Sequence, residues 1–105
     1  MSKTVPAHCD KRLWAVNYIL KTGGSGVTTT FYQEVGQPIL REPATRVQEN
    51  AKLDVIDQVI IEPFRWHILS TVVLHGVENI ESQRQAVTLG LNSTDPFSEL
   101  KCENI

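Results

Sequence analysis

The chain has 105 residues and a mass of 11.8 kDa, which is enough for one hydrophobic core and too little for two. Apolar residues make up 41% and charged residues 21%, a balance that excludes an intrinsically disordered chain. The net charge of −2 lacks the basic excess typical of a dedicated duplex-binding domain. We therefore expect one small globular domain over residues 1–105, and no motif in it identifies an activity.

Positive charge is concentrated at the N-terminal end. Residues 1–26 contain four basic residues and one acidic residue, whereas the rest of the chain is net negative. The first ten residues contain no apolar stretch typical of a secretory signal, and the longest apolar runs, such as 72–74, are far too short for a membrane span. We expect a cytoplasmic protein with a flexible N-terminus at 1–10 and no contact with membranes.

Two alternating segments occupy the first third of the chain. Over residues 12–22 every second residue from Trp14 to Leu20 is apolar or aromatic, and residues 27–35 alternate in a similar way. The loop between them, 23–26, reads Gly-Gly-Ser-Gly. Two such segments joined by a short glycine-rich loop predict an antiparallel hairpin. The loop lacks the Lys-Ser/Thr ending of a phosphate-binding loop, so we interpret it as a turn.

The next segment has a helical period. Val or Ala recurs every four residues from Val47 to Val59, and Pro43 suits the first turn of a helix. The pattern predicts a helix over 43–58, followed by a short strand at 59–62. The β-branched residues near the end of this region also fit a strand that replaces the second half of the helix.

Pro63 ends that region. Residues 64–75 carry apolar side chains on both sides of an alternating pattern, which is typical of a central strand. A helix that begins at Pro63 and ends at Gly76 is the alternative. Residues 77–82 are polar and predict a turn, and residues 85–91 alternate as an amphipathic strand.

The last segment, residues 94–105, contains cap-forming residues and Pro96, and predicts a short helix or a docked tail. The sequence has no internal repeat, low-complexity tract or heptad pattern. The predicted fold class is therefore α+β: approximately ββαββ, with an antiparallel sheet, one helix packed on it, and a C-terminal tail or short helix.

The spacing of cysteine and histidine predicts no metal and no cofactor. Cys9 and Cys102 stand near opposite ends without a CxxC pair, so we expect free thiols. His67 and His75 are eight residues apart, roughly 26 Å along a strand, which is too far for the two side chains to share an ion. His8 stands in no recognised zinc spacing.

Cations beside aromatic residues in the N-terminal strands suggest one binding function. Single-stranded nucleic-acid binders use this combination, because cations follow the phosphate backbone and rings stack on bases. The candidate contacts are Lys11, Arg12, Lys21, Trp14 and Tyr18. The rings share a side with apolar residues and therefore also fit a core.

Acidic residues and histidines define a catalytic alternative. Paired carboxylates can divide acid and base roles when burial separates their pKa values. A small enzyme would need Asp54, Asp57, His67 or His75 to converge in a pocket. No nucleophile or triad motif is recognisable, so we assign no catalytic residue and expect no enzymatic activity.

Surplus apolar β-surface favours a third function. Residues 64–75 present more apolar side chains than one helix could cover, as expected for a strand that packs on a partner. The candidate interaction residues are Trp66, Ile68, Leu69, Val72 and Val73. We therefore expect a non-enzymatic protein–protein interaction or homo-oligomerising module, with single-stranded nucleic-acid binding and a small enzyme as the alternatives.

Overall fold

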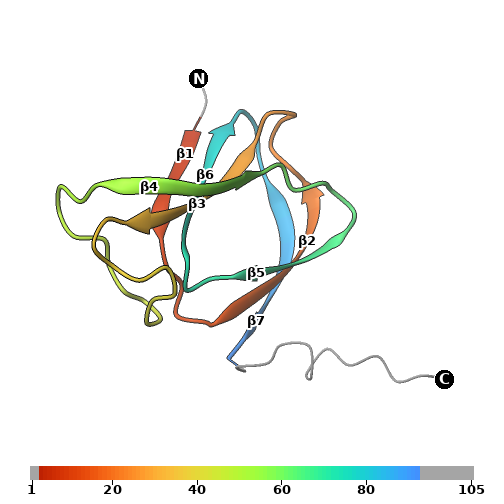
Figure 1. Ribbon diagram of the computed structural model, residues 1–105. Coiled ribbons are helices and arrows are strands. Elements are labelled where there is room, and N and C mark those ends of the chain that lie inside the picture. Colours follow the sequence, from red (N-terminus) through yellow and green to blue (C-terminus); the bar gives the residue numbers. More distant parts are fainter. Residues whose placement is uncertain (1–2, 93–105) are drawn as a thin grey trace.

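The structure, a computed structural model, describes residues 3–92, and these residues form two antiparallel β-sheets. The strands are β1 (Lys3–His8), β2 (Trp14–Lys21), β3 (Thr28–Glu34), β4 (Leu53–Val59), β5 (Trp66–Ser70), β6 (Leu74–Ile80) and β7 (Gln85–Leu91). One sheet has the strand order β1-β6-β3-β4 and the other has the order β5-β2-β7. The two sheets lie on opposite sides of the molecule (Figure 1). The described residues contain no helix with the length and apolar content needed to cross a membrane.

Strand β2 forms the centre of the three-stranded sheet. Tyr18 lies opposite Trp66 of β5 and opposite Val87 of β7. Successive side chains of a strand point to opposite faces, so Asn17 and Ile19 share one face of β2 and Tyr18 lies on the other. Asn17 and Ile19 line a cavity that residues of the other sheet also line. Their face is therefore the inner one, and Tyr18 lies on the outer face.

The four-stranded sheet presents β3 and β6 at its centre. Thr29 of β3 and His75 of β6 line the same cavity between the sheets, which identifies their side as the inner face. On the opposite side, the hydroxyl of Tyr32 donates a hydrogen bond of 2.7 Å to the carboxylate of Glu78. This outward side of β3 and β6 is therefore partly polar.

A loop over residues 35–52 packs against one end of that outward side. Arg41 in the loop donates a hydrogen bond of 2.8 Å to Glu34 at the end of β3, and the two side chains are only 7% and 4% exposed. The backbone N–H of Gln48 donates to the other oxygen of Glu34 at 2.9 Å, and the N–H of Arg41 donates to the carbonyl of Val72 at 3.0 Å. The hydrogen bonds from Arg41 and Gln48 lower the pKa of Glu34, so the buried carboxylate is ionised and satisfied.

The apolar core is small. Its buried apolar residues are Ala15, Val16, Ile19, Val27, Val72 and Leu74, while twelve large apolar side chains among the described residues are exposed. Four polar or charged residues are buried as well, among them Glu34 and Thr30. The described part of the chain therefore carries more apolar surface than its interior holds.

The predicted α+β fold class is wrong, because the described residues form strands and no helix. The region 43–58, expected to be a helix packed on the sheet, is a loop up to the start of β4 at Leu53. Ala44 and Asn50 have φ angles of 60° and 61°, a left-handed conformation that interrupts a right-handed helix. The β-branched residues that follow pair with β3 instead, and β4 ends at Val59, where the short strand 59–62 was expected to begin.

The predicted hairpin is wrong in its pairing. Both of its strands exist, as β2 and β3, but they belong to different sheets. Gly23 and Gly24 have φ angles of 92° and 142°, which glycine adopts readily, and they carry the chain from one sheet to the other. The carbonyl of Gly23 accepts hydrogen bonds of 2.9 Å from the N–H groups of Glu81 and Ser82. These bonds hold the glycine loop against the connection between β6 and β7.

Residues 64–75 form two strands in place of the predicted central strand. Strand β5 is an edge strand that ends at Ser70, and a turn at 71–73 leads into β6 of the other sheet. Strand β6 extends through Ile80, so the turn predicted at 77–82 is also wrong.

The prediction is correct for the last described strand and wrong for the first. The strand predicted at 85–91 is confirmed as β7. Strand β1 occupies residues for which the sequence predicted a flexible N-terminus and no strand. The tail predicted at 94–105 lies outside the described residues.

Candidate functional site

The outer face of the three-stranded sheet is almost entirely apolar. The strand register aligns nine side chains on it in three rows. The rows are Tyr18 with Trp66 and Val87, Val16 with Ile68 and Leu89, and Trp14 with Ser70 and Leu91. We call these nine residues the apolar outer face. None of them is charged, and Ser70 and the Tyr18 hydroxyl are its only polar side-chain groups besides the Trp N–H groups.

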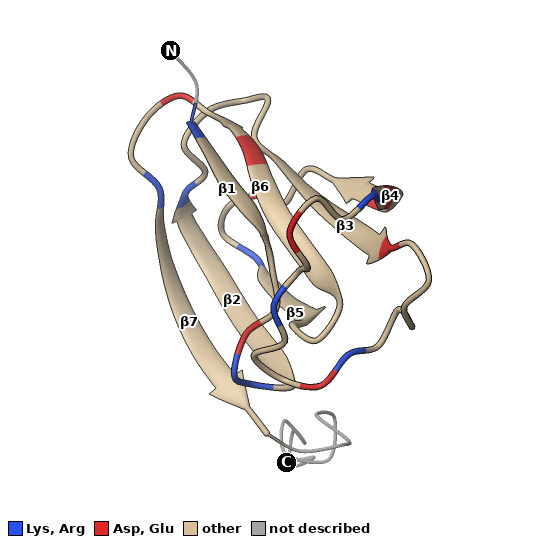
Figure 2. Ribbon diagram, turned by 90° about the vertical axis from the view of Figure 1, so that its left-hand side faces the viewer, with Lys and Arg blue, Asp and Glu red and all other residues tan. Residues whose placement is uncertain are grey.

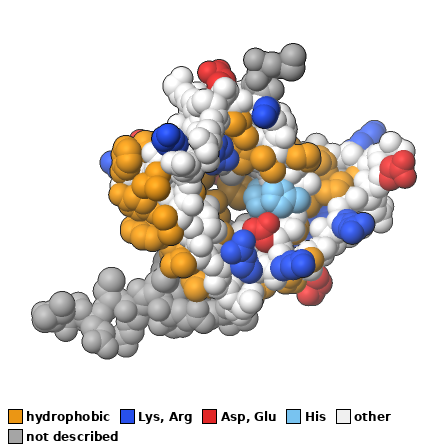
Figure 3. All heavy atoms as spheres, turned by 180° about the vertical axis from the view of Figure 1, so that it is seen from behind, with side chains coloured by type: hydrophobic (Ala, Val, Ile, Leu, Met, Phe, Trp, Pro, Cys, Tyr) orange, Lys and Arg blue, Asp and Glu red, His pale blue; other side chains and the backbone are white. Residues whose placement is uncertain are grey.

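The β5 and β7 sides of the apolar outer face are partly open to solvent, whereas Val16 at its centre is only 5% exposed. Trp66 is 58% exposed, Leu89 50% and Val87 47%. The rings of Tyr18 and Trp66 pack against each other with centroids 5.1 Å apart. Figure 3 shows hydrophobic side chains gathered on the left-hand lobe, which is the side that holds this sheet when Figure 1 is seen from behind. Large contiguous apolar patches exposed on soluble proteins often mark interaction surfaces.

A second candidate site lies where β1 ends beside β6. The antiparallel register places His8 directly opposite His75, and the ring centroids are 4.5 Å apart. Asp10, two residues after His8, brings a carboxylate oxygen to 3.4 Å from Nε2 of His8. One ligand atom from each of these three residues lies within 4.8 Å of the other two. Figure 3 shows histidine side chains beside an acidic one in a hollow of this surface.

Backbone carbonyls orient both rings. Nδ1 of His8 lies 2.8 Å from the carbonyl of Pro6, and Nδ1 of His75 lies 2.8 Å from the carbonyl of Val73. A carbonyl can only accept, so Nδ1 carries a proton in each ring, and Nε2 of His8 faces the Asp10 carboxylate. Burial lowers the pKa of His75 and outweighs the opposing effects of the hydrogen bond to Val73 and of the Asp10 carboxylate. The neutral form of His75 is therefore favoured.

The three residues border a cavity of about 280 Å³ between the two sheets. Asn17 lines the same cavity, and its Oδ1 is buried without a hydrogen-bond partner among the described residues. Arg84 lines it too, and burial lowers the pKa of its guanidinium. A buried acceptor without a protein partner indicates a place for a water molecule or a ligand.

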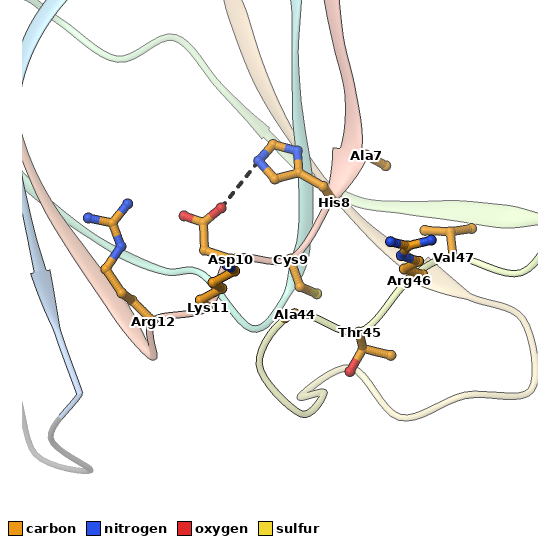
Figure 4. A pocket seen from close by; sticks show the side chains of 10 residues that line it. All are labelled: Ala7, His8, Cys9, Asp10, Lys11, Arg12, Ala44, Thr45, Arg46 and Val47. Atoms are coloured by element: carbon orange, nitrogen blue, oxygen red, sulfur yellow. Dashed lines mark ion pairs between the residues drawn. The ribbon is translucent and has the colours of Figure 1, made fainter.

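An open groove of about 670 Å³ flanks the cluster on the outside. In Figure 4, the side chains of His8 and Asp10 point toward each other, and Lys11, Arg12 and Arg46 also line the groove. The single acidic residue of this groove is therefore accompanied by three cations.

Cys9 points away from the paired His8 and Asp10 side chains (Figure 4). Its Sγ lies 3.5 Å from the carbonyl of Val72, and burial raises the pKa of its thiol. Cys9 forms no disulfide with another described residue, and Cys102 lies outside the described residues. The thiol is therefore protonated and does not belong to the cluster.

The residues predicted to contact nucleic acid divide between different surfaces. Trp14 and Tyr18 lie on the apolar outer face, whereas Arg12 packs over Gly90 on the inner side of the same sheet. Lys11 lines the groove, and Lys21 is the last residue of β2. Figure 2 shows Lys and Arg at strand ends and in loops, with none along β7.

The predicted interaction residues also divide. Trp66 and Ile68 lie on the apolar outer face, but Leu69 lines the inner cavity. Val72 and Val73 stand in the turn between β5 and β6, where Val72 is buried. The outer-face residues of β7 were not among the predicted interaction residues, although the alternation of 85–91 placed them on one side of a strand.

The predicted catalytic residues do not converge. Asp54 and Asp57 are exposed on β4, and the cavity that His75 lines contains neither of them, nor His67. The pairing of His8 with His75 was not predicted, because that contact depends on the register between the first and the sixth strand.

Comparison of the chain with family models, with curated proteins and with solved structures finds no match. The geometry of the two candidate sites is therefore the basis for a proposed function.

Proposed function

We propose that this chain is a non-enzymatic homo-oligomerising module, in which the apolar outer face of one copy packs on that of a second copy. One observation carries the proposal: the register of β5, β2 and β7 aligns nine side chains without a single charge. The cytoplasmic location expected from the sequence belongs to the same proposal.

The lack of charge favours a second copy as the partner. Around a twofold axis a surface patch meets itself, so any charged side chain near the axis would face a like charge. The apolar outer face has no such side chain, and self-association meets no like-charge repulsion there. Two sheets that pack face to face lie about 10 Å apart, a gap that aromatic and branched side chains from both sheets fill.

The size of the face predicts a reversible dimer. The nine residues span three strands about 4.8 Å apart and five residues of about 3.3 Å each, from Trp14 to Tyr18, which gives a projected area of roughly 240 Å². The accessible area is larger than this projected area because side chains protrude from the sheet and because Leu20 and Phe64 are exposed beside it. A standard interface buries roughly 800 Å² per partner. We therefore expect a dissociation constant of about micromolar order.

Single-stranded nucleic acid is the competing occupant of this face. Trp14, Tyr18 and Trp66 could stack on bases, but contacts with the phosphate backbone require cations. None of the nine positions carries one, and Arg12 lies on the inner side of the sheet. This distribution supports a protein partner over a nucleic acid.

The test compares two lysine substitutions at strand positions with similar exposure. Val87→Lys adds a charge to the apolar outer face, whereas Val55→Lys adds the same charge to β4 of the other sheet, where Val55 is 56% exposed. Sedimentation velocity over a micromolar dilution series is expected to show a monomer–dimer equilibrium for the wild-type chain and for Val55→Lys. Val87→Lys is expected to remain monomeric, because a charge buried in an apolar interface is strongly unfavourable.

Circular dichroism should show that both variants are folded, because both valines are exposed. A wild-type chain that stays monomeric, or equal weakening by both substitutions, would rule the proposal out. An oligonucleotide titration at low salt tests the nucleic-acid alternative. Val87→Lys adds a cation, so it should strengthen binding if nucleic acid occupies this face, and it should weaken self-association if a second copy does.

A further inference from the structure

The His8–Asp10–His75 cluster is independent of the proposed dimer interface. It lies at the edge of the cavity between the sheets, whereas the apolar outer face lies on the far side of the three-stranded sheet. His8 and His75 are cross-strand neighbours, and the pairing of β1 with β6 directs both rings to the same side. The backbone N–H of Asp10 donates to the carbonyl of Thr71 at 3.0 Å, which fixes the start of the connection that carries the carboxylate.

The hydrogen bonds of the cluster resemble those around metal ligands. Histidines that bind metals through Nε2 usually donate Nδ1–H to a carbonyl or carboxylate, which fixes the ring and its tautomer. Both His8 and His75 do so, to Pro6 and Val73. The only ion-pair partner of Asp10 among the described residues is His8, so no Lys or Arg occupies the carboxylate.

We propose that His8, Asp10 and His75 bind one divalent first-row transition-metal ion, with zinc as the expected occupant, through two Nε2 atoms and a carboxylate oxygen. Ligand atoms about 2.0–2.1 Å from a tetrahedral ion lie roughly 3.4 Å apart. Nε2 of His8 and Oδ1 of Asp10 already have this separation, at 3.4 Å. One ligand atom from each of the three residues lies within 4.8 Å of the other two, so binding needs side-chain rotation that brings these atoms closer by about 1–1.5 Å.

The donor set selects the class of metal. Imidazole nitrogens favour zinc and its neighbours over magnesium and calcium, which prefer oxygen ligands. Three protein ligands leave one tetrahedral position for water, as in exchangeable zinc sites. Four cations, Lys11, Arg12, Arg46 and Arg84, line the adjoining groove and cavity and oppose a second positive centre. We therefore expect weaker binding than in a closed site with four protein ligands.

The test uses the untagged full chain and zinc chloride in isothermal titration calorimetry. One ion per chain is expected. Loss of a group that only supports a metal ligand typically weakens binding about 10- to 100-fold, so loss of a ligand in Asp10→Asn or His75→Gln should weaken it at least that much. His67→Gln is the matched control, because His67 is a half-buried histidine of the other sheet outside the cluster. This variant is expected to bind zinc as the wild-type chain does.

A second measurement on the unmodified chain covers the case in which a variant does not fold. Zinc should shift the NMR signals of Nε2 in His8 and His75 and leave those of His67 unchanged. Cobalt(II) should give visible d–d absorption bands that zinc removes by competition. The proposal is overturned if zinc does not bind, or if His75→Gln binds it as tightly as His67→Gln.

Discussion

The outward faces of the two sheets are covered to different extents. On the four-stranded sheet, the loop 35–52 packs against the end of that face, and Glu34 and Leu74 are buried there. On the three-stranded sheet, Trp66 and Leu89 are about half exposed on the corresponding face. The covered end includes a charged residue, whereas the exposed face has none.

The difference follows from what each face needs when it is buried. Arg41 and Gln48 of the loop hydrogen-bond Glu34, so the loop provides the partners that a buried carboxylate needs. An apolar face needs only the removal of water, which any complementary apolar surface can provide, including an identical one. The chain's own loop therefore covers the end of the four-stranded sheet, where Glu34 needs specific partners. The apolar outer face needs no specific partners and is left available to a second copy.

Removal of the Arg41 side chain should have the largest effect on this contrast. Arg41→Ala leaves Glu34 buried without its cation and frees the loop, so we expect Tm to fall on the order of 10 °C or more. The matched control is Arg65→Ala, which removes an ion pair with Glu62 whose side chains are 71% and 63% exposed. Its Tm should change by about 2 °C or less. Equal losses in a thermal melt would show that the loop does not stabilise the sheet through Arg41.

A methyl group added to one strand of each sheet should have a smaller effect on stability, and the effect should differ between the two sheets. A Cβ on Gly76 of β6 would lie 2.6 Å from the carbonyl oxygen of Val5, so Gly76→Ala must displace β1. We expect a loss of about 1–3 kcal/mol in the free energy of unfolding, measured by urea denaturation.

The control for that substitution is Gly90→Ala in β7. There the added Cβ would meet only the side chain of Arg12, which can move away, so a change of about 0.5 kcal/mol or less is expected. A loss as large as that of Gly76→Ala would mean that Arg12 is held rigidly over the three-stranded sheet.

Acid should weaken the covered end of the four-stranded sheet. The folded pKa of Glu34 lies below its ordinary value of 4.5, so its stabilising contribution is complete above pH 4.5 and is lost as the pH falls through the folded pKa. Thermal melts over this acidic range should show the loss in the wild-type chain. Glu34→Gln should have a lower Tm near neutral pH and a flatter dependence on pH, and an unchanged slope would contradict the assignment.

Local pattern was sufficient for three of the strands. The alternation at 12–22, 27–35 and 85–91 predicted β2, β3 and β7, because alternation along a strand depends only on neighbouring residues. The four-residue period from Val47 to Val59 predicted a helix that does not form. Left-handed backbone at Ala44 and Asn50 and pairing with β3 outweighed that period.

The two sites depended on contacts that no local pattern contains. Alternation showed that Val87 and Leu89 share one side of a strand, but which side faces the interior was decided by the position of the four-stranded sheet. His8 and His75 lie far apart in the sequence and meet only through the register of β1 with β6. Local alternation therefore predicts which side chains share a face of a strand. Which faces meet depends on the folded arrangement of the strands, because strand pairing is set by long-range hydrogen bonding and burial.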